Sequence, residues 1–307
     1  GPVGGLAVSA KRDARPLSPQ SCSPRIHEEE SEYGSLLRGL VSLQRSSRKS
    51  GAKDRPGPGP GGILTSFEEG MSVLTQTICD GLGNQVRLNT PVQGVSYSQA
   101  CYTVHTPEGA EEFDALVIAS PAYAQAEMLR DLEPSLARLV AGIDYPALAV
   151  VCLGYCRQDV GDRMDGFGFL VPSREKRDIL GTVADSNVFP NRAPAGHTLL
   201  RTLVGGARRP ELAGLPDDRL LTTVQSNLRD IMGITAEPEF ASIYRHEYAI
   251  PQYLVGHARR LENIKKALNA FPGLVLTGNA YRGVSLNDCI LNANRTALEL
   301  LKDRVNG

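Results

Sequence analysis

The sequence predicts an α+β protein in which an α/β-type layer of strands and helices is interrupted by a domain built on a mixed or antiparallel sheet. Three observations lead to this prediction. Four β-rich runs between residues 147 and 204 are joined by short polar connections, as in antiparallel sheets. Runs with helical apolar spacing lie on both sides of them. Near the end of the chain, a short apolar run is followed by glycines and a further helix.

The first 62 residues carry little sustained hydrophobic pattern. Residues 1–25 are rich in Gly, Pro, Ser and Arg, which is typical of a disordered segment. Residues 28–44 have helical spacing. Residues 45–62 are basic and then Pro/Gly-rich, which predicts an exposed loop. A basic tract can bind acidic lipid or nucleic acid, but a solvated loop is the commoner outcome.

From residue 63 onward, short β-rich runs alternate with amphipathic helical runs. We expect helices over 67–79, from Pro121, over 216–232 and over 257–270. In three of them the apolar stripe would face inward: Met71, Leu74 and Ile78 in the first, Leu220, Leu221, Val224 and Leu228 in the third, and Leu261, Ile264 and Leu268 in the last. We expect strands over 86–88, 92–97, 102–105, 113–120, 147–155, 166–171, 179–185, 198–204 and 239–248.

The most informative local pattern lies near the end of the chain. Residues 274–277 are a short apolar run after a Pro-Gly turn, which predicts a buried strand. Gly278 and Gly283 follow, and helical spacing begins at Asp288. A strand, a glycine turn and a helix start can direct free backbone N–H groups at an electron-rich ligand. An ordinary strand-to-helix connection has the same spacing.

The composition excludes several classes of protein. The 307 residues carry a formal net charge of −1, which gives no electrostatic case for nucleic acid. No stretch approaches the ~18 apolar residues of a membrane span, and no signal peptide is visible, so we expect a cytoplasmic location. The six cysteines are scattered without metal-ligand spacing, which favours buried reduced thiols over a metal site or disulfides.

Several longer motifs resemble one family. Residues 278–284 (Gly-Asn-Ala-Tyr-Arg-Gly-Val) and 287–290 (Asn-Asp-Cys-Ile) are similar to the carboxy-terminal flavin motif of the protoporphyrinogen and coproporphyrinogen oxidases, within the flavin amine oxidase group. The resemblance also includes residues 32–39, 166–172 (Gly-Phe-Gly-Phe-Leu-Val-Pro), 189–194 (Phe-Pro-Asn-Arg-Ala-Pro), 204–206 and 251–257 (Pro-Gln-Tyr-Leu-Val-Gly-His).

The resemblance implies a reaction and its cofactor. In this family FAD removes six electrons and six protons from a porphyrinogen, and molecular oxygen reoxidises the flavin and becomes hydrogen peroxide. The cofactor carries the redox chemistry, so no acid–base pair in the protein is required. The resemblance also implies heme biosynthesis, a porphyrinogen substrate, and peripheral membrane contact or a homodimer as further partners.

The resemblance also implies site residues. For FAD they are Asn279, Val284, Ser285 and Leu286, with the backbone of Val92 at the adenine end. For the porphyrinogen they are Leu170, Val183 and Leu203, which would face the flat apolar ring. Leu203 departs from the plant enzymes, where an aromatic residue stacks on the ring. For all three, core packing of strand residues is the alternative interpretation, and no residue is predicted to be catalytic.

One expected feature of the family is missing. The sequence contains no strand, Gly-x-Gly-x-x-Gly turn and helix in that order, so the cradle for the FAD pyrophosphate is not found. The chain therefore resembles the carboxy-terminal part of such an enzyme, and we expect it to bind FAD weakly or not at all when alone, unless a missing half is supplied in trans. A carotenoid-desaturase-like oxidoreductase and a non-enzymatic porphyrin-binding remnant are the alternatives.

The expected domains are 1–25 (disordered), 26–62 (helix and basic loop), 63–140 and 256–307 (FAD-binding parts) and 141–255 (substrate-binding sheet domain).

Overall fold

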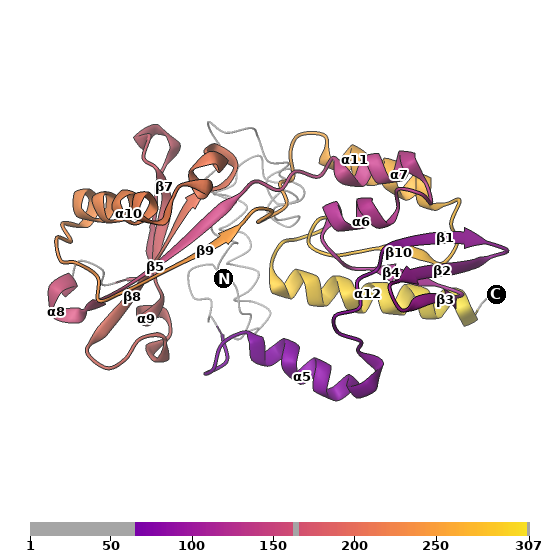
Figure 1. The fold of residues 1–307 in the computed structure, drawn as a ribbon, viewed down its shortest axis with the longest axis horizontal. Helices are drawn as coiled ribbons and strands as arrows, with labels where there is room; N and C mark the ends of the chain where they lie inside the picture. The colour runs from indigo at the N-terminus through magenta and orange to yellow at the C-terminus, as the bar shows by residue number, and fades with distance from the viewer. Residues whose placement is uncertain (1–64, 162–165, 306–307) are drawn as a thin grey trace, which may run out of the picture.

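The computed structural model describes residues 65–161 and 166–305. The elements form two groups that lie side by side (Figure 1). The sheet lobe contains β5 to β9 with α8, α9 and α10. The βα lobe contains β1 to β4, β10 and the helices α6, α7, α11 and α12. The predicted features of residues 1–62 lie outside the described residues.

The sheet lobe is built on five strands in the order β6-β7-β8-β5-β9, and all of its pairs are antiparallel. This confirms the antiparallel sheet expected from the four β-rich runs and the later strand. The elements are β5 (Leu148–Cys156), α8 (Arg157–Val160), β6 (Gly168–Leu170), β7 (Ile179–Ala184), α9 (Asp185–Val188), β8 (His197–Gly205), α10 (Asp217–Met232) and β9 (Phe240–His246).

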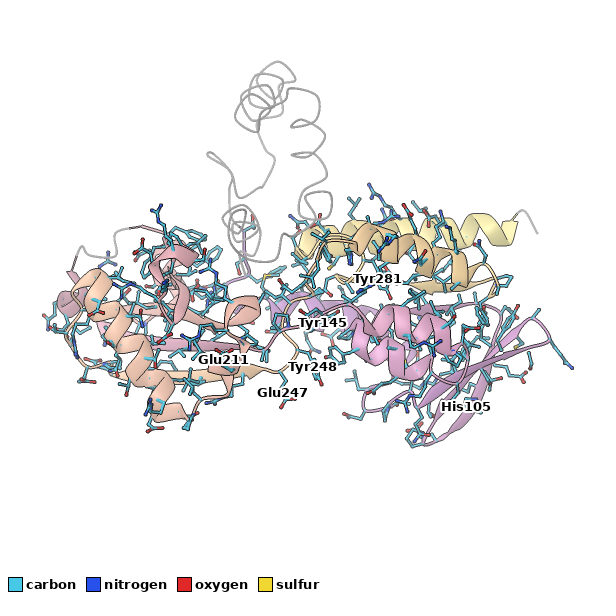
Figure 2. The ribbon with its side chains drawn as sticks, turned by 90° about the horizontal axis from the view of Figure 1, so that it is seen from above. His105, Tyr145, Glu211, Glu247, Tyr248 and Tyr281 are labelled. Carbon is cyan, nitrogen blue, oxygen red and sulfur yellow. The ribbon has the colours of Figure 1, made fainter. Side chains whose placement is uncertain are left out.

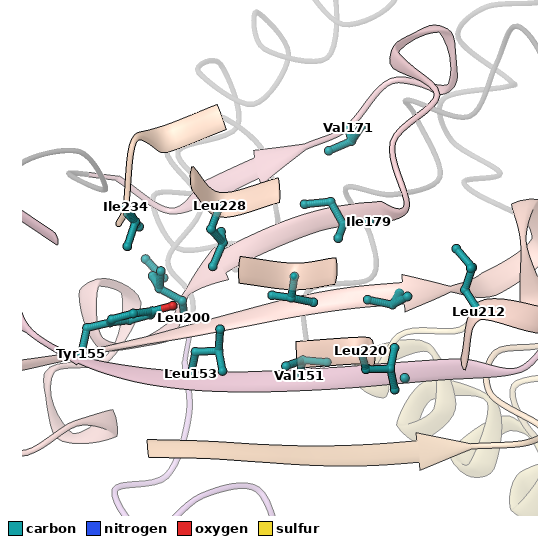
Figure 3. Packing of buried hydrophobic residues seen from close by; sticks show 14 of the residues in the cluster. Val151, Leu153, Tyr155, Val171, Ile179, Leu200, Leu212, Leu220, Leu228 and Ile234 are labelled. Atoms are coloured by element: carbon teal, nitrogen blue, oxygen red, sulfur yellow. The ribbon is translucent and has the colours of Figure 1, made fainter. Parts of the chain in front are cut away.

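One face of this sheet holds the core of the lobe. Residues alternate between buried and partly exposed along β5 and β8, because successive side chains point to opposite faces. The buried set includes Val151, Leu153 and Leu200, which pack with Leu220 and Leu228 of the predicted inner stripe of α10 (Figure 3). The prediction of α10 and of its buried side is therefore confirmed, apart from Leu221, which is only partly buried.

The βα lobe combines a small antiparallel meander with a two-stranded parallel sheet. Its buried core contains Tyr102, Leu129, Leu136, Val140 and Ile264. Its elements are β1 (Gly94–Ser98), β2 (Cys101–Thr106), β3 (Gly109–Phe113), β4 (Leu116–Ile118), α6 (Ala122–Met128), α7 (Pro134–Ala141), α11 (His257–Leu268), β10 (Leu274–Leu276) and α12 (Leu286–Val305), with β10 parallel to β4.

The segment before β1 differs from the sequence-based expectation. The helix α5 runs over Ser72–Leu82, five residues later than predicted, and none of its residues is buried. The side chains of Met71 and Ile78, which we expected to face inward, are 39% and 53% exposed. No strand forms over residues 86–88, because nothing in the described chain pairs with them and Leu88 is 72% exposed.

Four of the α-helices and strands have no counterpart in the sequence-based expectations: the short helices α8 and α9, the strand β3 and the helix α7. The strand β3 is fully exposed and carries Glu111 and Glu112, so it lacks the apolar alternation that marks a strand. The helix α7 begins with Pro134, and the side chain of Glu133 accepts a hydrogen bond from the Ser135 amide at 3.0 Å. Both are typical start signals of a helix that the sequence analysis did not use.

The described cysteines correct another expectation. All five are unpaired and partly exposed rather than fully buried (Cys79, Cys101, Cys152, Cys156 and Cys289). The predicted domain limits at residues 140 and 255 stay a prediction.

Candidate functional site

The turn between β10 and α12 is fixed by a reciprocal hydrogen-bonded cap. The Ser285 hydroxyl donates to Oδ2 of Asp288 at 2.6 Å and accepts from the Asp288 amide at 3.1 Å. The Ser285 amide donates to the same carboxylate at 3.4 Å. This is the capping-box arrangement, with a carboxylate at the positive end of the helix. The predicted succession of strand, glycine turn and helix is confirmed. Ser285 caps the start of the helix α12.

Two glycines give the turn its path. Gly278 and Gly283 both have positive φ, at 119° and 67°. A Cβ at Gly283 would overlap the side chain of Asp288, and a Cβ at Gly278 would lie 3.4 Å from the carbonyl oxygen of Ala119. Gly283 is therefore required by both its backbone conformation and the cap beside it.

Polar groups near this turn lack protein partners. The backbone amides of Leu286 and Asn287, in the first turn of α12, donate to no group of the described chain. Ser120 Oγ and His257 Nε2 are buried and also have no partner among the described residues. The two free amides fit an electron-rich ligand at this end of α12, so the residues present are compatible with part of a flavin.

A buried glutamine ties the carboxyl ends of the two parallel strands together. The side-chain nitrogen of Gln125 lies 3.2 Å from the carbonyl oxygen of Ile118, 2.6 Å from that of Ser120 and 3.0 Å from that of Thr277. The Tyr281 hydroxyl donates to the Gln125 carbonyl oxygen. Burial, together with the neighbouring Tyr145, raises the pKa of Tyr281 far above its ordinary value. Both tyrosines lie near the inner end of the βα lobe (Figure 2).

A second contact supports the turn from the motif at residues 251–257. The Tyr253 hydroxyl donates to the backbone carbonyl of Asn279. The Tyr253 ring stacks on the His257 ring with centroids 4.4 Å apart. Burial lowers the pKa of His257, opposed by a hydrogen bond with the backbone of Tyr281. His257 is therefore a neutral packing residue of the turn.

The residues predicted for FAD occupy different parts of the βα lobe. Asn279, Val284 and Ser285 are half-buried in or beside the turn, and Leu286, at the start of α12, is 46% exposed. Val92 precedes β1 and packs against the core of this lobe. Their roles in binding stay predictions.

The three residues predicted for the porphyrinogen share one face of the five-stranded sheet. Leu170, Gly181, Leu203, Val150 and Tyr244 lie in register across all five strands, so their side chains project to one face. Val183 lies on the same face, two residues along β7. This face is opposite the core under α10, and Leu170 on it is 43% exposed. Core packing therefore does not account for Leu170, and the role of all three in binding stays a prediction.

The motif at residues 189–194 connects the sheet lobe to the segment before α5. The guanidinium of Arg192 donates to the carbonyl oxygens of Phe67 and Glu68, both at 2.8 Å, and to Ser66 Oγ at 2.9 Å. The side-chain amide nitrogen of Asn191 also donates to the backbone carbonyl of Glu68. This motif therefore acts as a clamp between distant segments of the chain.

Sequence reasoning missed the groups that hold the turn in place. Gln125 lies in α6 between alanines, with Tyr123 and Met128 in the same helix, and nothing in its local pattern marks it as buried. An amide among apolar neighbours becomes a recognisable signal only when strand ends are known to lie beside it. Within the described residues, no cluster of His, Cys, Asp and Glu could hold a metal ion.

The family model described as flavin containing amine oxidoreductase matches residues 8–301. The chain belongs to this family, which confirms the predicted flavin group and the α+β class. It is 30% identical over 306 residues to the chloroplastic protoporphyrinogen oxidase of Nicotiana tabacum, covering 94% of this chain and 56% of that protein. It is 30% identical over 289 residues to the coproporphyrinogen III oxidase of Bacillus subtilis, covering 91% and 58%.

A solved structure agrees with these matches. A provisionally named protoporphyrinogen oxidase from Exiguobacterium superposes with a TM-score of 0.75 at 26% identity, covering 95% of this chain and 60% of that one. The chain thus spans somewhat more than half the length of the relatives it matches. Across the described residues, no helix is both long enough and apolar enough to cross a membrane.

Proposed function

We propose that this chain is the carboxy-terminal part of an FAD-dependent porphyrinogen oxidase of heme biosynthesis. The reaction would convert protoporphyrinogen IX to protoporphyrin IX, or coproporphyrinogen III to coproporphyrin III. The observation that carries the proposal is the convergence of Leu170, Val183 and Leu203 on one partly exposed face of the sheet. The porphyrinogen oxidases among its relatives support the same substrate class.

The end of α12 and its preceding turn would hold part of the cofactor. In this proposal Val284, Ser285 and Leu286 would border the flavin, the amides of Leu286 and Asn287 would be its donors, and Asn279 and Val92 would contribute further backbone contacts. FAD, when bound, supplies the capacity to accept hydrogen from the substrate. The protein's part is to keep the turn rigid, through Gln125 and the Ser285 cap, and to exclude water with apolar side chains.

The acceptor in this proposal is molecular oxygen. The porphyrinogen gives up six electrons and six protons, which three oxygen molecules take up as three molecules of hydrogen peroxide. No residue of this chain has to store an electron or act as a general base. A cytoplasmic location, peripheral membrane contact and a homodimer belong to the same proposal.

A non-enzymatic porphyrin-binding role is the second candidate. It is favoured by the parallel sheet, which has only β4 and β10 within the described residues. Parallel sheets of this class normally have more strands, covered on both faces, and a glycine-rich turn that holds the pyrophosphate. The side chain of Val117 on β4 is 41% exposed, and several apolar side chains of α12 are exposed to a greater extent. A polypeptide that completes this layer in trans would convert a binding protein into an enzyme.

The test compares the purified chain alone with the chain mixed with the amino-terminal half of a relative. FAD binding is followed by flavin fluorescence, and turnover by porphyrin fluorescence together with oxygen uptake. Porphyrinogen oxidation in either sample supports the enzyme. Porphyrin binding without turnover in both samples supports the second candidate. Desaturation of a polyene without activity on porphyrinogen, or no binding of either porphyrin or flavin, would overturn the proposal.

A matched pair of variants connects the activity to the sheet face. Leu203→Asp places a charge on the proposed substrate face and should lower porphyrin affinity at least tenfold, since a charge beside an apolar ring loses solvation. Thr222→Asp lies on the exposed side of α10 and should leave the affinity unchanged. Equal effects of the two changes would remove the sheet face from the proposal.

A further inference from the structure

The face of the sheet that carries Leu170, Val183 and Leu203 also carries one arginine. Arg201 lies between Leu199 and Leu203 on that face of β8 and pairs directly with Val183 of β7 and Cys152 of β5. Residues opposite one another across strands are about 5 Å apart, and residues two apart along a strand about 6.8 Å. Arg201 therefore has predicted porphyrinogen contacts as its immediate neighbours in two directions.

The guanidinium of Arg201 is only partly satisfied by the protein. One terminal nitrogen donates to Oδ1 of Asp185 at 2.7 Å, and the two side chains are 30% and 15% exposed. Nε of Arg201 is buried and has no hydrogen-bond partner in the described chain. An unpaired donor of a charged group costs free energy in a setting of low polarity.

The surroundings of this arginine are poorly solvated. Burial raises the pKa of the Cys152 thiol. The charge of Arg201 lowers this pKa and that of Asp185 raises it, so both charged groups lie close to the thiol. The Asp185 carboxylate balances the charge of Arg201 when no ligand is present and bonds one of the two terminal nitrogens of the guanidinium. The remaining donors keep the geometry that suits a carboxylate.

We propose that Arg201 binds a carboxylate arm of the porphyrinogen and so selects the free-acid form of the macrocycle. This inference rests on the proposed function of the sheet face. The ring would lie on the apolar side chains of Leu170, Val183 and Leu203, and one arm would reach the terminal guanidinium nitrogen of Arg201 that does not bond Asp185. Arg201 is in this view a specificity-determining residue that takes no part in the oxidation.

The experiment measures binding of oxidised porphyrins by quenching of their fluorescence, which requires neither FAD nor turnover. Coproporphyrin III, with four carboxylates, is compared with its uncharged tetramethyl ester. Arg201→Gln should weaken the acid about 10- to 100-fold, the range for a charge-assisted hydrogen bond, and change the ester less than about twofold. Arg201→Lys should recover part of the loss, and added salt should weaken only the acid.

Two further variants separate binding from folding. Arg177→Gln is a matched control, because Arg177 is 32% exposed and pairs with Asp230 of α10. It should bind both porphyrins like the parent chain. The double variant Arg201→Gln/Asp185→Asn removes the pair without leaving an unpaired carboxylate, and it should show the same selective loss of the acid.

The outcomes distinguish this inference from the proposed function. If the parent chain binds both porphyrins but neither Arg201 variant changes the preference for the acid, the role of Arg201 is wrong and the substrate face stands. If the variants weaken acid and ester equally, Arg201 acts through packing and the inference is again overturned. If the parent chain binds neither porphyrin, alone or mixed with the amino-terminal half of a relative, both the inference and the proposed function fail.

Discussion

The Tyr281 hydroxyl donates a hydrogen bond to the side-chain carbonyl of Gln125, 156 residues earlier in the chain. Gln125 in turn contacts the carbonyl of Ile118, the last residue of β4, and that of Thr277, the residue after β10. The geometry of the glycine turn before α12 therefore depends on a helix far away in the sequence. This buried network holds the part of the molecule to which we assign flavin binding.

Loss of Gln125 should destabilise the βα lobe. Gln125→Leu keeps the approximate volume but removes the amide that bonds the half-buried carbonyls of Ser120 and Thr277 and the acceptor of the Tyr281 hydroxyl, which should cost about 3 kcal/mol. Urea unfolding measures this difference. Gln76→Leu removes an exposed amide that bonds Asp80, and it should change stability by less than about 0.5 kcal/mol. Equal effects of the two changes would argue against the network.

Gly283→Ala should disrupt the turn more than its backbone angle alone requires. A positive φ costs an alanine about 1 kcal/mol, and overlap of the new Cβ with Asp288 adds to this and breaks the cap. We expect a total loss of about 2–3 kcal/mol in thermal or denaturant unfolding. Gly256→Ala is the control, since Gly256 is left-handed (φ 92°, ψ −1°) with nothing within 4 Å of the new methyl group. If both variants lose the same free energy of unfolding, overlap with Asp288 contributes nothing to the loss.

Removal of the Arg192 clamp should release the segment before α5. Arg192→Gln loses the hydrogen bonds to Ser66, Phe67 and Glu68. Hydrogen exchange of the amides in residues 66–71 should become about tenfold faster, as expected for a local loss of about 1.4 kcal/mol. Arg209→Gln, which breaks exposed ion pairs with Asp178 and Glu211, should leave this segment unchanged. Acceleration in both variants would indicate a general loss of stability.

Stability should fall in strong alkali because of buried tyrosines. Burial, and then the charge of Glu237, raises the pKa of Tyr155 to about 12. Above about pH 10 the unfolded chain releases this proton while the folded chain retains it. The free energy of unfolding is therefore maintained below pH 10 and should fall by about 1.4 kcal/mol per pH unit up to pH 12 for this group.

Tyr155→Phe should remove this contribution, while Tyr248→Phe, at an exposed ring, should not. Urea unfolding at pH values from 9 to 12 measures both profiles. The slope that remains in Tyr155→Phe reflects Tyr102, whose pKa burial also raises to about 12, together with Tyr145 and Tyr281, whose pKa values burial raises as well. A slope that is identical in the two variants would show that Tyr155 titrates normally.

The sequence by itself was sufficient for the family and for most of the elements. Apolar alternation predicted β5, β7 and β8, helical spacing predicted α10 and α11, and the glycines after residue 277 predicted the turn before α12. These features follow from neighbouring residues, so local periodicity records them. Where the local pattern misled, at residues 86–88 and in the inner stripe of α5, nothing in the described part of the chain covers the apolar residues.

Only the tertiary structure decided how the candidate site is assembled. Leu170, Val183 and Leu203 belong to three strands, and the register between strands places them on one face with Arg201. Gln125 and Tyr281 meet only because β4 and β10 run parallel and end together. Such contacts join residues that are distant in the chain, and their energy depends on pairing and burial, which no local pattern encodes.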